Sequence, residues 1–179
     1  MVNGLNYLST RGGESSLKYE DVLLSGLSRD GGLFMPADWP TFTNSEIKDM
    51  KNLSYSELAA KIMSPFIEPS LTYDQINKIC HSTYSNFTHK DVAPLYQIKN
   101  DLYILELFHG PTLAFKDYAM QFLAKAFDEA LLKKNKRGVI LGATSGDTGS
   151  AALEAFKGKS NVDIFILFPK GRVSEVQQK

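Results

Sequence analysis

A loop of small residues stands between an apolar run and an alanine-rich segment, and this order constrains the fold more than any other feature. The run at 139–141 (VIL) is typical of a buried strand, and the segment at 150–156 has the spacing of an amphipathic helix. The loop between them, GATSGDTG at 142–149, contains three glycines, which permit positive φ and close approach of the backbone to a ligand. With a second apolar run at 162–168, the pattern predicts a parallel βαβ unit.

The same loop is suited to an anion. The unpaired N–H groups and the positive dipole end of the following helix favour a phosphate or a carboxylate. An ordinary strand-to-helix turn has a similar composition, so the loop alone leaves both readings open. It lacks the Gly-Lys-Ser/Thr ending of a P-loop, and its spacing differs from the dinucleotide-binding G-x-G-x-x-G pattern.

A lysine upstream of the loop is a candidate for chemistry. Lys116 follows a Gly-Pro turn at 110–111 and three apolar residues at 113–115. Loss of hydration among apolar neighbours favours the neutral, nucleophilic form of an amine. Such an amine serves as a Schiff-base nucleophile or a general base. The alternative is a surface lysine at a helix start, with its stem buried and its head in water.

Five stretches in one order resemble the threonine synthase family. The likeness covers most of the chain and is weakest at about 42–90. The motifs that carry it are YLSTRG at 7–12, DGGLFMP at 30–36, FHGPT at 108–112 followed by AFKD at 114–117, GATSGDTGSAA at 142–152, and PKGRVS at 169–174 running into Val176 and Gln177.

This resemblance implies a pyridoxal-phosphate enzyme of the tryptophan-synthase β-like fold, fold type II, with no metal. Lys116 would hold the cofactor as a Schiff base and move protons. Asp147 would lie beside the cofactor's 3-oxygen. The other implied cofactor contacts are Ser145 and Gly146, and the implied substrate contacts are Thr144, Ser145, Thr148, Gly149 and His109.

Two residues near the lysine have alternative readings. His109 serves either as a group near the substrate phosphate or as a loop histidine that fixes the turn. Asp117 is expected to cap the following helix rather than to take part in chemistry.

The expected architecture is α/β, with a mostly helical amino-terminal domain at 1–92 and the start of the parallel cofactor domain at 93–179. Three capping boxes predict helix starts in the first part: Thr43 with Glu46, Ser54 with Glu57, and Thr72 with Gln75. The helix after Ser54 is expected to end at Pro65. In the second part we expect a hairpin of 95–98 and 102–107, a helix to about 134, and the βαβ unit, with a further helix opening after 172.

Composition narrows the class of protein. Lys and Arg together number 20, equal to Asp and Glu, which argues against a nucleic-acid partner. The single cysteine, Cys80, fits a reducing compartment. No apolar run approaches the ~18 residues that span a bilayer, so no membrane is expected. The first motif begins at Tyr7, which leaves no room for a targeting peptide, and we expect a cytoplasmic protein that is a monomer or a dimer.

The implied reaction converts O-phospho-L-homoserine and water to L-threonine and phosphate, the last step of threonine biosynthesis. A threonine-synthase-like phospholyase is the alternative within the fold, and the segments at 109–112 and 170–174 look more like the synthase. Members of the family are longer, with a glycine-rich phosphate cradle and a residue for the pyridine nitrogen further along. We therefore expect an amino-terminal fragment, inactive by itself, and an isolated non-catalytic unit is the third possibility.

Overall fold

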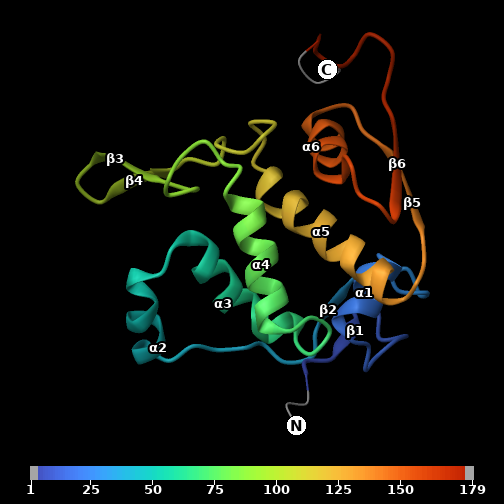
Figure 1. The fold of residues 1–179 in the computed structure, drawn as a ribbon, viewed down its shortest axis with the longest axis horizontal. Helices are drawn as coiled ribbons and strands as arrows, with labels where there is room; N and C mark the ends of the chain where they lie inside the picture. Colours follow the sequence, from blue (N-terminus) through green and yellow to red (C-terminus); the bar gives the residue numbers. More distant parts are fainter. Residues whose placement is uncertain (1–3, 176–179) are drawn as a thin grey trace. The chain divides into compact units, whose positions relative to one another are not determined.

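A computed structural model describes residues 4–175 and divides the chain into two compact units, Met1–His81 and Ser82–Lys179. The first unit carries β1 (Tyr7–Ser9), α1 (Tyr19–Ser25), β2 (Phe34–Pro36), α2 (Asn44–Asp49), the 3₁₀ helix η1 (Met50–Asn52), α3 (Tyr55–Ile67) and most of α4 (Tyr73–Tyr84) (Figure 1). The division falls after His81, and the expected domain boundary at 92/93 stays a prediction. Within residues 4–175, no helix is both long and apolar enough to cross a membrane.

All three predicted capping boxes form in the first unit. The Thr43 and Ser54 hydroxyls each accept from the backbone N–H three residues on, and the Glu46 and Glu57 carboxylates accept from the backbone N–H of Thr43 and Ser54. Thr72 and Gln75 make the same exchange before α4. These bonds satisfy N–H groups that a helix start leaves without intrahelical acceptors.

The expected helix end at Pro65 is wrong, because α3 continues through Pro65 to Ile67. A proline within a helix removes one N–H donor and leaves the carbonyl four residues earlier without it. Here that carbonyl belongs to Lys61, and it accepts a hydrogen bond of 3.3 Å from Ser64 Oγ instead. The substitute donor accounts for a helix that continues two residues beyond its proline, to Ile67.

A small antiparallel sheet in the first unit joins two of the motifs that the sequence presents separately. Strands β1 and β2 pair with Leu8 opposite Met35, a sheet that the expectation of a mostly helical first domain did not include. Beside them, the carboxylate of Asp30 accepts from Ser9 Oγ at 2.8 Å, from the Gly13 N–H at 2.7 Å and from the Gly32 N–H at 2.8 Å. A Cβ on Gly32 would overlap Ser9 Oγ, so glycine is needed there. Both motifs therefore serve one carboxylate-centred turn.

Acid should weaken this turn. The Gly32 N–H, followed by the Ser9 hydroxyl, lowers the pKa of Asp30 from 3.8 to about 2. Because the folded pKa is depressed, the stabilisation is present above the unfolded pKa and is lost as the pH falls through the folded pKa. Asp30→Asn should lower the melting temperature at neutral pH and flatten its dependence between about pH 4 and pH 2. Asp38→Asn, on an exposed side chain, is the matched control, and equal acid profiles for Asp30→Asn and wild type would contradict the assignment.

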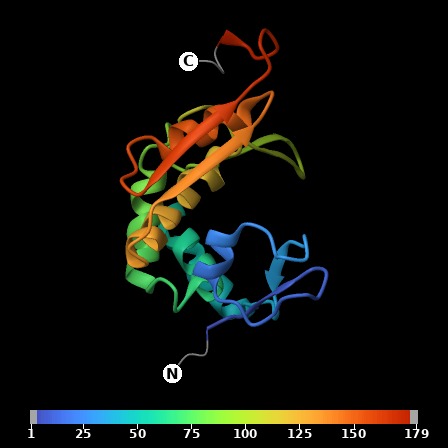
Figure 2. The same cartoon turned by 90° about the vertical axis from the view of Figure 1, so that its right-hand side faces the viewer.

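The second unit contains the predicted hairpin and the predicted parallel pair. Strands β3 (Leu95–Lys99) and β4 (Leu102–Leu105) are antiparallel, with a bulge between Gln97 and Lys99. After α5 (Asp117–Lys133) come β5 (Gly138–Ala143), α6 (Asp147–Phe156) and β6 (Val162–Leu167). β5 and β6 lie side by side and run in parallel (Figure 2), and their register begins with Gly138 opposite Val162. The βαβ prediction is confirmed.

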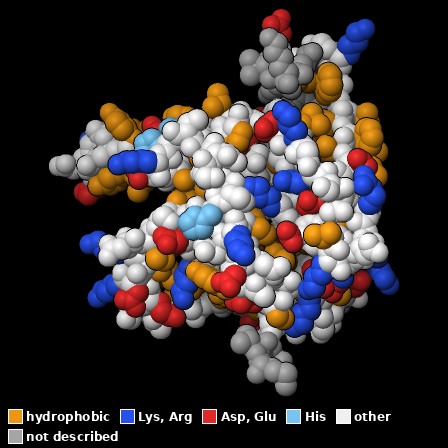
Figure 3. Space-filling model, viewed as in Figure 1, with side chains coloured by type: hydrophobic (Ala, Val, Ile, Leu, Met, Phe, Trp, Pro, Cys, Tyr) orange, Lys and Arg blue, Asp and Glu red, His pale blue; other side chains and the backbone are white. Residues whose placement is uncertain are grey.

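Helices α5 and α6 pack together on one face of the β5–β6 pair. Phe127 of α5 meets Phe156 of α6 edge to face at 6.0 Å, and Leu131 lies under Gly138. The opposite face is apolar and uncovered: Val139 and Leu141 are 68% and 70% exposed. Figure 3 shows hydrophobic side chains beside the β5–β6 pair and over the β3–β4 hairpin. Parallel sheets are normally covered on both faces, so this face is suited to contact with further protein.

Candidate functional site

The glycine-rich loop is shorter than the sequence predicts. Strand β5 includes Gly142 and Ala143, and α6 begins at Asp147 rather than after Gly149, so the connection is residues 144–146. Its glycines do not supply positive φ. Gly142 and Gly149 instead allow close packing, because a Cβ would lie 2.8 Å from Ile166 Cδ1 at Gly142 and 2.5 Å from Thr144 Cγ2 at Gly149. Gly149 therefore lets helix α6 lie close to Thr144 and to Ile166 of β6, and Gly142 leaves room for the Ile166 side chain.

The start of α6 offers free backbone donors. Thr144 N–H bonds to Leu167 O, and Gly146 N–H bonds to Thr144 Oγ1. Within residues 4–175, no hydrogen bond is recorded for the N–H groups of Ser145, Asp147 or Thr148. A Cβ on Gly146 would meet nothing within 4 Å, so the loop is open to a ligand at this point. Unpaired N–H groups at the positive end of a ten-residue helix form a favourable place for an anion.

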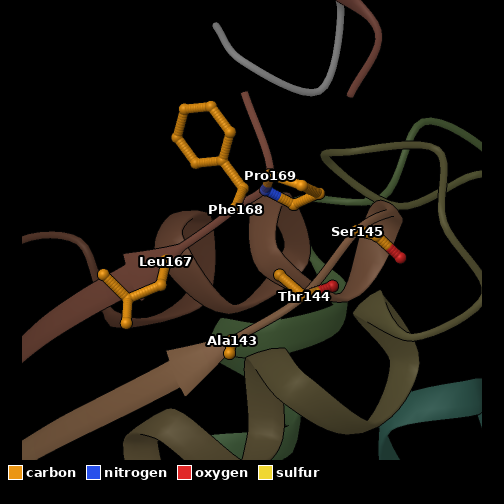
Figure 4. A pocket seen from close by; sticks show the side chains of 6 residues that line it. All are labelled: Ala143, Thr144, Ser145, Leu167, Phe168 and Pro169. Carbon is orange, nitrogen blue, oxygen red and sulfur yellow. The ribbon is translucent and has the colours of Figure 1, made fainter. Parts of the chain in front are cut away.

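An open hollow of about 510 Å³ lies at the carboxyl ends of the two parallel strands. The end of β5 and the loop after it line one side with Ala143, Thr144 and Ser145, and the end of β6 and the segment after it line the other with Leu167, Phe168 and Pro169 (Figure 4). Thr144 and Ser145 are site residues that the sequence predicts, whereas Phe168 and Pro169, after β6, are not among the predicted site residues. The rule that ligands bind beyond the carboxyl ends of parallel strands would have found them.

Lys116 reaches the start of α6. Its Nζ lies 2.8 Å from Asp147 Oδ1, and it sits 4.5 Å from the centre of the Phe115 ring. The lysine is the last residue before α5, and Asp147 is the first residue of α6. Two residues that are 31 positions apart in the sequence thus form one ion pair at the start of α6, where the unpaired N–H groups favour an anion.

His109 contacts residues of its own segment and of the stretch between α4 and β3. Its Nε2 lies 2.8 Å from Glu106 Oε2, its ring packs 5.0 Å from the ring of His89, and its carbonyl accepts from Thr88 N–H at 2.9 Å. These contacts match the reading of His109 as a turn-fixing histidine, and Glu106 is a partner that sequence analysis missed. A role toward the substrate stays a prediction.

The remaining predicted residues are spread over the first turn of α6 and the segment after β6. Thr148 is half-buried and Gly149 is buried, where it packs against Thr144. The segment from Pro169 to Ser174 follows the hollow in a turn closed by Arg172 N–H and Pro169 O at 3.1 Å. Val176 and Gln177, and most of the helix expected after Arg172, lie outside the described residues.

Comparisons with known proteins agree on one family. The family model of the threonine synthase N terminus matches residues 6–84. Threonine synthase of Pseudomonas aeruginosa is 51% identical over 175 residues, which is 98% of this chain and 37% of that protein. Threonine synthase-like 2 of Xenopus laevis is 40% identical over 97% of this chain and 37% of that protein.

Solved structures give the same result. The crystal structure of PLP-bound threonine synthase from Brucella melitensis superposes with a TM-score of 0.94 at 48% identity, over 98% of this chain and 38% of that one. Threonine synthase from yeast gives a TM-score of 0.90 at 38% identity, over 97% and 37%. The chain spans about 37% of the length of the curated relatives that it matches. It belongs to the threonine synthase family.

Proposed function

We propose that this chain is the lysine-bearing part of a threonine synthase, a pyridoxal-phosphate-dependent carbon–oxygen lyase of fold type II. The observation that carries the proposal is the 2.8 Å pair of Lys116 Nζ and Asp147 Oδ1, located where α6 presents unpaired N–H groups. A lysine amine, a carboxylate and an anion site meet at one point. A cofactor with an aldehyde and a phenolic oxygen, together with a substrate that carries a carboxylate, needs these three features.

The residues present fit pyridoxal phosphate in their donor chemistry. Lys116 Nζ would bind the aldehyde carbon, and Asp147 Oδ1 would face the phenolic oxygen, with Ser145 and Gly146 beside it. When bound, the cofactor supplies an electron sink that stabilises negative charge on a substrate carbon. The protein's part is to hold, orient and move protons, which falls to Lys116 and Asp147.

The substrate would place its carboxylate at the start of α6. The N–H groups of Ser145 and Thr148 and the hydroxyl of Thr144 are available there as donors. Lys116 Nζ, released from covalent attachment, would take a proton from the substrate carbon and return it to a neighbouring one. Asp147 Oδ1, 2.8 Å from Lys116 Nζ, would stabilise the ammonium form of Lys116 while the lysine carries that proton. The net change is loss of the γ-phosphate and addition of water at the β-carbon.

A phospholyase is the second candidate, supported by the 40% identity to threonine synthase-like 2. Both activities release phosphate from a phosphorylated amino compound, but only the synthase adds water. Incubating the full-length protein with O-phospho-L-homoserine should give phosphate and L-threonine in equal amounts. Phosphate with a keto acid and ammonia in place of threonine would assign the phospholyase instead.

We also propose a cytoplasmic location, supported by the single, buried thiol of Cys80.

Asp147 should tune the bound cofactor. In Asp147→Asn, an amide that donates as well as accepts replaces the carboxylate, so the visible absorbance of the full-length holoenzyme and its pH dependence should shift. Absorbance titration measures both. Asp163→Asn is the matched control, because Asp163 is an exposed carboxylate paired with Arg137 at 3.1 Å. An unchanged spectrum with full activity would place Asp147 away from the cofactor.

A further inference from the structure

The segment that carries Lys116 is held by side chains rather than by regular structure. Between the end of β4 at Leu105 and the start of α5 at Asp117, the chain forms neither helix nor strand. Leu113 has φ 62°, a left-handed conformation that is unfavourable for a residue with a side chain. Such a conformation persists only where surrounding contacts over-determine it.

Asp117 supplies two of these contacts. It is 0% exposed, its Oδ2 accepts from Thr112 N–H at 2.7 Å, and its Oδ1 accepts from Thr112 Oγ1 at 2.7 Å. A Cβ on Gly110 would overlap Asp117 Cβ, so the turn lies directly on the carboxylate. The expectation that Asp117 caps its own helix is wrong, because its oxygens bond back to the turn. A buried carboxylate is stable only when it accepts strong hydrogen bonds, which ties the turn to it.

Hydrogen bonds hold the backbone on both sides of Lys116. Before the lysine, the turn at 110–113 is closed by Leu113 N–H to Gly110 O at 3.1 Å and anchored by the bonds of Thr112. After it, Asp117 N–H bonds to Ala114 O at 3.0 Å, and Met120 N–H bonds to Lys116 O at 2.8 Å. These bonds fix the backbone around Lys116, so only its side chain is free to move.

We infer that Asp117 is a positioning residue: its bonds with Thr112 hold the lysine-bearing turn so that Lys116 Nζ meets Asp147. The inference rests on the proposed function, because it takes Lys116 as the cofactor lysine. A purely structural Asp117 would affect the melting temperature alone. A positioning Asp117 also sets how fast Lys116 captures the aldehyde and which spectrum the bound cofactor shows.

The test uses full-length protein freed of cofactor, with three variants. Asp117→Asn places an amide donor opposite one of the two Thr112 donors. Thr112→Val removes the hydroxyl bond and keeps both the carboxylate and the backbone bond. Thr112→Ser retains both donors and is the matched control. After addition of pyridoxal phosphate and quenching with borohydride at increasing times, peptide mapping measures the pyridoxyl adduct on Lys116, and absorbance records the spectrum before quenching.

Asp117→Asn and Thr112→Val should form the adduct about 10- to 100-fold more slowly, since a displacement of about 1 Å has effects of this size. Their absorbance maxima should shift, and Thr112→Ser should follow the wild type. Folded variants with wild-type capture rates and spectra would overturn the inference while leaving the proposed function intact. If Asp117→Asn does not fold, Thr112→Val decides. Absence of a Lys116 adduct in the wild type would contradict the proposed function and the inference together.

Discussion

Lys116→Ala in the full-length protein should abolish covalent cofactor attachment and lower kcat by about 10²- to 10⁴-fold, the range that a positioned acid–base group contributes. The amine is the group in the site that both binds an aldehyde and moves a proton at neutral pH. The assay is threonine formation from O-phospho-L-homoserine, together with the visible spectrum of the protein. Retention of wild-type turnover would remove Lys116 from the reaction.

The loss should not arise from unfolding. The Lys116 and Asp147 side chains are 27% and 44% exposed, and ion pairs of this kind stabilise a fold by about 0–1 kcal/mol. The melting temperature of Lys116→Ala should therefore stay close to that of the wild type. Lys157→Ala is the matched control, because Lys157 is an exposed lysine 3.9 Å from Glu154. It should retain both the cofactor and the activity.

The 179-residue chain by itself should bind pyridoxal phosphate weakly and form no threonine. The hollow beside Thr144 and Ser145 is open, and the β5–β6 face at Val139 and Leu141 is uncovered. Affinity depends on walls that hold a ligand from several sides before it binds, and these residues supply one side. Without further contacts, a cofactor attached at Lys116 would stay exposed to water and to hydrolysis.

Two measurements check this expectation. Titration of the purified chain with the cofactor, followed by absorbance, gives the affinity, and phosphate release from O-phospho-L-homoserine gives the activity. The full-length protein under the same conditions is the control. Stoichiometric tight binding with turnover by the 179-residue chain would show that its residues suffice for the site.

Local patterns were predictable where local forces decide them. The capping boxes at Thr43, Ser54 and Thr72 form because each needs only residues three positions apart. The parallel pair of β5 and β6 follows from the strand, helix and strand order. The start of α6 was placed too late because glycine is a poor helix former, and the packing of Gly149 against Thr144 and Ile166 overrides that preference.

Contacts between distant residues were beyond reach of the sequence pattern. Leu8 and Met35, which pair between β1 and β2, are 27 positions apart, and Ser9 is 21 positions from Asp30. Nothing in either motif identifies its partner. Asp117 was expected to cap α5, because an acidic residue at the start of a helix is usually found in that role. Its bond to Thr112 depends instead on the fold of the preceding turn. Lys116 was a candidate from its apolar neighbours and Asp147 from the family resemblance, but their direct pairing emerged from the structure.

Borohydride reduction of the full-length holoenzyme, followed by peptide mapping, tests the assignment of Lys116 most directly. Reduction converts a Schiff base into a stable amine, so the modified lysine carries the pyridoxyl group through digestion and mass spectrometry. We predict one pyridoxyl group per chain, on Lys116 in the peptide that contains Phe115 and Asp117. A pyridoxyl group on another lysine, or on none, would contradict it.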